Sequence, residues 1–147
     1  MFCYQEVIEI DTLSQNELYA RAKSWIANAY RSANDVIQLD DPEKGIIIAK
    51  GFTKNYWNTN DLDIYHTLTI EIKEGRYRYT FSDFVMHFPL FRNSVASFPA
   101  SEKPMEDGRG MIGYKKVLER SDKELRLLIE NLKSAMTRSS LVGGSDW

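Results

Sequence analysis

Hydrophobic and polar residues alternate most regularly in the middle of the chain, where the spacing predicts β-strands over residues 64–73 and 76–84. Glu74-Gly75 separates the two runs, and a two-residue connection that contains glycine is typical of a β-hairpin. This turn sets the register, because a one-residue slip would mix apolar and polar side chains on each face. The predicted pairs on the apolar face are Ile72 with Tyr77, Ile70 with Tyr79 and Leu68 with Phe81; those on the polar face are Glu71 with Arg78, Thr69 with Thr80 and Thr67 with Ser82.

Shorter strands are predicted over residues 36–40 and 46–54, on either side of a turn at residues 41–45. Proline and glycine within that turn favour the backbone angles that a reversal needs. If the turn holds five residues, the two strands pair in one antiparallel register. The predicted pairs are Leu39 with Ile47 and Ile37 with Ala49.

Two segments have the spacing of amphipathic helices. Ser14 and Glu17 form a capping-box pattern, and a helix is predicted behind them that ends near residues 32–34. Ser121 and Glu124 form a second capping box, and the helix behind it is predicted to run to about residue 138. The apolar stripes are Leu18, Ala22, Trp25, Ile26, Ala29 and Tyr30 in the first helix, and Leu125, Leu128, Ile129, Leu132 and Met136 in the second.

The remaining segments are less regular. Residues 4–10 are rich in aromatic and β-branched types and predict a first strand, whereas residues 55–63 are rich in Asn and Asp and predict a polar loop. Residues 85–116 hold three of the four prolines but are too apolar for a solvated linker. We expect part of this segment to pack, with a short edge strand near residues 86–90.

The order strand, helix, four strands, helix predicts an α+β fold in which both helices cover one face of an antiparallel sheet. A chain of 147 residues, with 43% hydrophobic and 27% charged residues, fits a single domain. We place that domain at residues 1–138 and expect a flexible tail at residues 139–147. No apolar run approaches the roughly 20 residues of a membrane-spanning helix, so no membrane span is predicted.

The segments Glu17-Leu18-Tyr19-Ala20-Arg21-Ala22-Lys23-Ser24-Trp25 and Ala33-Asn34-Asp35-Val36-Ile37-Gln38, with the later Lys50-Gly51, resemble an uncharacterised bacterial family. This family of unknown function is described as having a TBP-like fold, after the TATA-box-binding protein. The resemblance covers roughly residues 4–84 and, more loosely, the closing helix, and it implies a curved antiparallel sheet backed by two helices. It carries over no catalytic residue, because the family has no established activity.

The resemblance also implies an exported protein of the cell envelope, since members of the family usually begin with a signal sequence. Residues 1–4 lead directly into the first predicted strand, without the basic start and apolar stretch of such a signal. We therefore expect the protein in the periplasm or cell envelope if a signal was removed, and in the cytoplasm otherwise.

His66 and Asp83 lie opposite each other in the predicted hairpin register. An aspartate that orients an imidazole is the acid–base arrangement of many hydrolases. No nucleophile lies obviously within reach, and Cys3, the single cysteine, is remote in sequence. The other interpretation is that the two side chains satisfy each other at the rim of the sheet. His87 is the only other histidine, and without clustered carboxylates no metal site is predicted.

Two further motifs match a ligand-binding pattern only in part. Residues 108–113 match the glycine spacing of a dinucleotide-binding loop, but no strand–helix–strand unit surrounds them, so we predict no cofactor. Residues 58–63 contain oxygen ligands suited to calcium, but they lack the glycine and the distant glutamate of a calcium loop.

The second face of the predicted sheet is polar in the hairpin and apolar elsewhere. Its candidate binding residues are Val36, Ile46, Ile48, Phe52, Tyr65 and Phe84, with Tyr65 and Phe84 expected to pair. An apolar patch on a face without helices must be covered or used. Residues 85–116 would cover it; otherwise it would bind a partner or form a homodimer.

The net charge of −2 argues against nucleic acid as the partner. Arg76, Tyr77, Arg78 and Tyr79 interleave basic and aromatic residues, but in a strand the two types point to opposite faces. The favoured hypothesis is therefore a non-catalytic cell-envelope module that binds an unknown protein or an apolar ligand through the second face and the loop at residues 85–116. The alternative is a small hydrolase built on His66 and Asp83.

Overall fold

The computed structural model describes residues 3–30, 36–57, 60–88, 94–97 and 109–137. The elements of this part are β1 (Tyr4–Glu9), α1 (Gln15–Ala29), β2 (Ile37–Asp41), β3 (Ile46–Trp57), β4 (Asn60–Lys73), β5 (Arg76–Phe88), β6 (Ser94–Ser97) and α3 (Arg109–Thr137). The strands form one antiparallel sheet in the order β1-β5-β4-β3-β2, and β6 adds to β5 beyond the end of β1.

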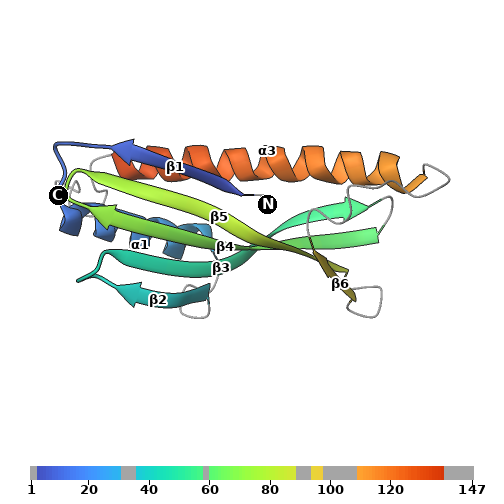
Figure 1. Ribbon diagram of the computed structural model, residues 1–147, viewed down its shortest axis with the longest axis horizontal. Helices are drawn as coiled ribbons and strands as arrows, with labels where there is room; N and C mark the ends of the chain where they lie inside the picture. Colours follow the sequence, from blue (N-terminus) through green and yellow to red (C-terminus); the bar gives the residue numbers. More distant parts are fainter. Residues whose placement is uncertain (1–2, 31–35, 58–59, 89–93, 98–108, 138–147) are drawn as a thin grey trace, which may run out of the picture.

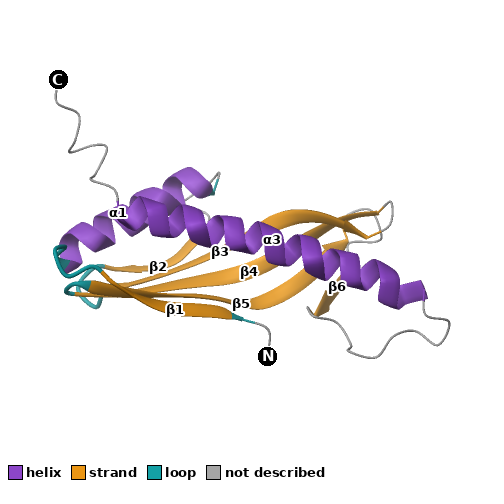
Figure 2. Ribbon diagram, turned by 90° about the horizontal axis from the view of Figure 1, so that it is seen from above, coloured by secondary structure: helices purple, strands orange, loops and turns teal. Residues whose placement is uncertain are grey.

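Both helices lie on the same face of the sheet (Figure 1), and α3 follows the sheet along most of its length. The view from above shows α1 beside one end of α3, with the strands as a separate layer below them (Figure 2). The predicted α+β architecture is therefore confirmed. We call the opposite side of the sheet the helix-free face, because neither α1 nor α3 lies on it.

The core lies between the sheet and the two helices. Leu18 and Ile26 of α1, Leu68 and Phe81 of the hairpin, and Leu132 of α3 are all fully buried there. Removing a side chain of this size from water contributes roughly 1.5–3 kcal/mol to stability. The alternation that was visible in the sequence thus places one side of every central strand in the core.

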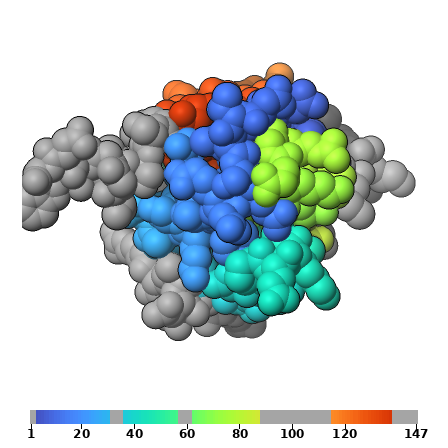
Figure 3. Space-filling model, turned by 90° about the vertical axis from the view of Figure 1, so that its left-hand side faces the viewer, coloured from blue at the N-terminus to red at the C-terminus, as the bar shows by residue number. Residues whose placement is uncertain are grey.

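The hairpin between β4 and β5 has the predicted register over all six pairs from Ile72–Tyr77 to Thr67–Ser82. Gly75 has φ +72° in the turn, a backbone conformation that glycine adopts without strain. The Gly75 N–H donates to Leu13 O, and the Ile10 N–H donates to Gly75 O. The turn is therefore held against the connection between β1 and α1, at the end of the molecule that faces the viewer in Figure 3.

The register shifts between Tyr65 and Thr67, where a β-bulge interrupts the pairing of β4 with β5. Asp83 has φ +55°, which is unusual for a residue other than glycine. Beyond this point Tyr65 pairs with Val85 and Asp63 pairs with His87. A bulge adds one residue on one strand, so every pair beyond it differs from the prediction.

Two other stretches also differ from the predictions. The polar loop over residues 55–63 is wrong, because β3 continues to Trp57 and β4 begins at Asn60. Asn55 is tolerated in the buried part of this strand because its Nδ2 donates to Val117 O and Ser121 Oγ, at 3.1 and 2.7 Å. In the first hairpin Ile37 pairs with Ala49 as predicted, but an irregularity then places Leu39 opposite Ile48 instead of Ile47.

The second helix starts earlier than its capping box suggested. Ser121 lies inside α3 and is fully buried against β3, so it accepts a hydrogen bond from Asn55 instead of capping a helix. Gly110 and Gly113 lie within the first turns of α3, and residues 98–108 are outside the described part. The edge strand expected near residues 86–90 is the end of β5. In α1, by contrast, Ser14 Oγ accepts from the Glu17 N–H as predicted, but the helix ends at Ala29, before the predicted end near residues 32–34.

Candidate binding surface on the helix-free face

Two aromatic side chains stand beside each other on the helix-free face. Phe52 of β3 lies opposite Tyr65 of β4, with ring centroids 5.3 Å apart. Phe52 is 45% exposed and Tyr65 is 39% exposed, although both lie in the middle of long strands. Strand alternation explains their position, because the neighbouring positions Gly51 and His66 are buried on the core side of the sheet. The pair therefore offers apolar surface to a ligand.

Aliphatic residues extend this surface toward β2. Ile46 and Ile48 are partly exposed on β3, and Leu39, opposite Ile48, is 42% exposed. We call Leu39, Ile46, Ile48, Phe52 and Tyr65 the apolar strip. Lys50 lies between Ile48 and Phe52 on the same strand and is exposed. Apart from Lys50 the exposed residues of this part of the face are apolar, and apolar side chains that gather on one face commonly mark an interaction site.

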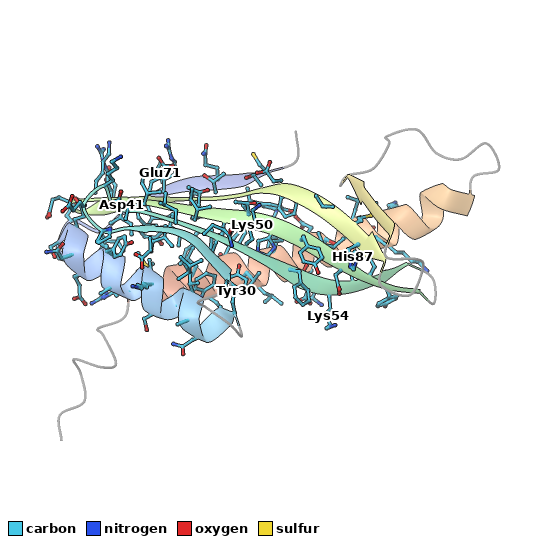
Figure 4. All side chains as sticks on the ribbon, turned by 90° about the horizontal axis from the view of Figure 1, so that it is seen from below. Tyr30, Asp41, Lys50, Lys54, Glu71 and His87 are labelled. Atoms are coloured by element: carbon cyan, nitrogen blue, oxygen red, sulfur yellow. The ribbon has the colours of Figure 1, made fainter. Side chains whose placement is uncertain are left out.

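A polar cluster of Lys54, Asp63 and His87 borders the aromatic pair. His87 Nδ1 lies 4.0 Å from Asp63 Oδ2, and Lys54 Nζ lies 3.9 Å from Asp63 Oδ1. The His87 ring meets the Tyr65 ring edge-on at 5.6 Å, and Lys54 Nζ lies 5.7 Å from the Phe52 ring centroid. Figure 4 shows Lys54 and His87 near one end of the sheet, with Glu71 toward the other. Polar groups therefore frame the apolar strip at this end.

The opposite end of the face is charged. Arg78 Nε and Nη2 donate to the two carboxylate oxygens of Glu71 at 2.8 and 2.7 Å, and this bidentate contact lowers the pKa of Glu71. A shallow pocket of about 270 Å³ lies here between Val7, Glu71, Lys73, Arg76, Tyr77 and Arg78. The hydroxyl residues Thr67, Thr69, Thr80 and Ser82 occupy the sheet between this end and the aromatic pair.

The predicted pairing of His66 with Asp83 is wrong. The β-bulge leaves His66 without a paired residue on β5, His66 is 2% exposed in the core, and Asp83 is exposed to solvent. His66 Nε2 instead shares a 2.8 Å hydrogen bond with the Tyr30 hydroxyl. The geometry does not assemble the acid–base pair on which the hydrolase hypothesis depended.

Apolar and aromatic side chains surround His66. Its ring centroid lies 5.3 Å from that of Phe81 and 6.2 Å from that of Phe84. Burial lowers the pKa of His66 to about 4, and it raises the pKa of Tyr30. Nδ1 of His66 is buried without a hydrogen-bond partner among the described residues. His66 is thus neutral near pH 7 and acts as part of the core.

Two of the six predicted binding residues lie elsewhere. Phe84 is 4% exposed on the core side, where it packs edge-on against Tyr4, so its predicted pairing with Tyr65 is wrong. Val36 packs against the core. Ile46, Ile48, Phe52 and Tyr65 do lie on the helix-free face. The loop at residues 85–116 was expected to cover this face. Within it, β6 instead extends the sheet beside β5, and residues 98–108 are outside the described part.

The sequence interpretation missed Asp63 and His87 as neighbours. Both positions lie beyond the bulge, and residue 63 was assigned to a loop, so the alternation alone did not bring them together. Continuing β4 back to residue 60 and allowing one extra residue at the bulge would have paired them. Within the described residues, no three His, Cys, Asp or Glu side chains are placed to hold a metal ion. None of the described helices has the length and apolar character of a membrane span.

A family of unknown function with a TBP-like fold, DUF4468, matches residues 4–87, more than half of the chain. The chain belongs to this family. A TBP-like protein from Parabacteroides distasonis has a similar structure, with a TM-score of 0.62, 16% identity, and coverage of 89% of this chain and 92% of that one. A DUF4468 family protein from Bacteroides ovatus has a TM-score of 0.65 at 10% identity, with coverage of 95% and 88%.

At these identities, the two structures show that the DUF4468 chain shares their fold and nothing more specific. Among curated proteins, none matches the chain. The resemblance to a TBP-like family that was seen in the sequence is confirmed, as are the antiparallel sheet and the two helices that it implied.

Proposed function

We propose that this DUF4468 chain is a non-catalytic binding or assembly module that holds a partner protein or an apolar ligand on its helix-free face. One observation carries the proposal: Leu39, Phe52 and Tyr65 are each about two-fifths exposed on the face that α1 and α3 leave open. Covering such side chains would contribute roughly 25 cal/mol for each Å² of apolar surface removed from water. This is the driving force of most protein association.

The distribution of polar groups supports recognition as well as burial. The polar cluster of Lys54, Asp63 and His87 borders the aromatic pair on one side, and Thr67 and Thr69 border it on the other. An apolar centre with polar groups at its rim is the usual arrangement of a protein interface. Location in the cell envelope is part of the proposal, and it rests on the family resemblance.

Site-specific photocrosslinking in the native host tests the proposal. We expect a photoreactive residue at position 52 or 65 to give a discrete adduct, because both side chains lie within the proposed interface. Leu127 supplies the matched control, since it is a 52% exposed apolar residue on α3, away from this face. An adduct at twice the mass of the chain would identify a second copy as the partner.

A Phe52→Ser variant with the photoreactive residue at position 65 completes the test. We expect the adduct to be lost while the protein stays folded, with a loss of only about 1–2 kcal/mol in the free energy of unfolding, because Phe52 is nearly half exposed. The same adducts from position 127, or none from positions 52 and 65, would refute the proposal.

A further inference from the structure

Among the described residues, one edge of β3 is unpaired over part of its length. On the side away from β4, β2 pairs with β3 only from Ile46 to Ala49. β3 itself continues to Trp57, and no described strand pairs with residues 50–57 on that side. An exposed edge presents unpaired backbone N–H and C=O groups to any extended chain that approaches it.

The hydrogen-bond pattern shows which residues of β3 direct their backbone N–H and C=O groups toward this edge. The Ile72 N–H donates to Gly45 O at 2.7 Å, and the register of β3 with β4 then continues without a shift to the end of both strands. Backbone groups alternate in direction along an antiparallel strand, so the odd-numbered residues of β3 face β4. The even-numbered residues Lys50, Phe52, Lys54 and Tyr56 therefore direct their N–H and C=O groups away from β4.

Tyr56 agrees with this assignment, because side chains satisfy both of its backbone groups from outside the sheet. Its N–H donates to Asn55 Oδ1 at 2.7 Å, and its carbonyl accepts from Arg120 Nη2 of α3. The Arg120 guanidinium also lies 3.6 Å from the Tyr56 ring centroid. The chain thus closes the far end of the edge itself. Lys50, Phe52 and Lys54 have no such backbone partner among the described residues.

The side chains of the open stretch indicate what it would bind. Lys50 and Lys54 are exposed on the helix-free face, on either side of Phe52. A second copy that paired antiparallel about Phe52 would set Lys50 opposite Lys54 twice, and like charges in opposed positions are destabilising. Acidic side chains at those two positions would instead form favourable cross-strand pairs. An acidic partner therefore fits this edge better than a second copy does.

We propose that residues 50–54 of β3 bind an extended acidic segment of a partner protein, which adds to the sheet as a further antiparallel strand. The segment would place an acidic residue opposite Lys54, an apolar residue opposite Phe52 and an acidic residue opposite Lys50. Main-chain hydrogen bonds supply affinity in strand addition, and alternate side chains supply specificity. This inference deepens the proposed function and rests on it, because the alternate side chains lie on the helix-free face.

Fluorescence anisotropy with a labelled peptide of sequence Thr-Glu-Thr-Val-Thr-Glu-Thr tests the proposal. We expect it to bind at least 10-fold more tightly than the same peptide with Lys in place of Glu. A K50E/K54E variant should reverse that preference, because it exchanges the charges of the edge. Equal affinities for the two peptides, or no saturable binding by either, would overturn the proposal.

N-methylation separates strand addition from simple charge attraction. Methyl groups on the backbone nitrogens of Glu, Val and Glu remove the N–H groups that would face β3, so binding should be lost. Methyl groups on the two inner Thr nitrogens point away from β3 and should leave most of the affinity. A Lys54→Pro variant should bind more weakly than Lys54→Ala, because proline also removes an outward N–H. Equal binding of the two methylated peptides would contradict strand addition.

The outcomes distinguish this inference from the proposed function. If the N-methylated peptides bind alike while the adducts at positions 52 and 65 form, the edge is not the docking element and the face remains the interface. If the peptide binds with the expected dependence on its N–H groups and no adduct forms in cells, the inference about the edge holds. The proposal that the helix-free face binds a partner is then refuted.

Discussion

Replacing Gly51 with alanine is expected to destabilise the protein by about 3 kcal/mol, the upper part of the range for overpacking a core. A Cβ at this position would meet Cε1 of Tyr30 at 2.2 Å and Cδ1 at 2.7 Å. The ring has little freedom to move away, because its hydroxyl is bonded to His66 and Trp25 packs edge-on against it at 6.1 Å. Urea unfolding followed by circular dichroism measures the loss.

A double-mutant cycle with Tyr30→Ala supplies the control. Removing the ring leaves space for the new methyl group, so adding Gly51→Ala to Tyr30→Ala should cost far less than adding it to the wild type. Alanine in a strand is otherwise no worse than glycine. A loss below about 0.5 kcal/mol for Gly51→Ala alone, or strictly additive losses, would show that Tyr30 does not lie on Gly51.

Acidification from pH 6.5 to pH 4 is expected to lower the free energy of unfolding by about 3 kcal/mol through His66 alone. Burial lowers the pKa of His66 to about 4 in the folded protein, whereas in the unfolded chain it stays near 6.5. The unfolded state therefore binds a proton first as the pH falls, and the stability from neutral His66 is lost across this window. Above about pH 7.5 the histidine is neutral in both states and contributes no slope.

Comparison with a His66→Phe variant isolates this contribution. Phenylalanine fills a similar volume among Phe81 and Phe84 but does not titrate, so the difference in unfolding free energy between the two proteins should change with pH. Carboxylates such as Glu6 and Asp122, whose pKa values are lowered by their partners, remain in both proteins and cancel. Parallel stability curves between pH 6.5 and pH 4 would show that His66 is accessible to water.

Local rules predicted the hairpin because its information is local. The Glu74-Gly75 turn and the alternation on both sides of it specify the same register, and every pair as far as Thr67–Ser82 follows. The capping box at Ser14 is likewise a short-range signal, and the observed helix begins there. The hairpin prediction was reliable because the turn and the alternation are independent signals that agree.

The failures come from tertiary contacts that alternation does not encode. The bulge near Asp83 moves Phe84 into the core and brings Asp63 opposite His87, and no residue type in that stretch demands an extra residue. Asn55 is found within a strand because Ser121 and Val117 of α3 satisfy its amide. Polar residues of this kind favour loops in isolation, and their partners lie more than 60 positions away in the chain.

The candidate surface was predicted only in part, because alternation assigns a strand residue to a face but does not show how the strands assemble. Ile46, Ile48 and Phe52 precede the bulge along the chain and obey simple alternation, so their face was correct. The open edge of β3 depends on where β2 stops pairing, which is a property of the assembled sheet. The periodicity of the sequence does not predict how many residues of β3 are left unpaired by β2.

The central claim is that the helix-free face presents its apolar side chains to solvent, and paramagnetic relaxation by a soluble gadolinium chelate tests it most directly. The Phe52 and Tyr65 rings should relax strongly, as should the Ile48 methyl groups to a lesser degree, whereas those of Ile47 and Ile70 on the core side should not. Protection of Phe52 and Tyr65 to the level of Ile47 would contradict the account, because the face would then be covered in the free protein.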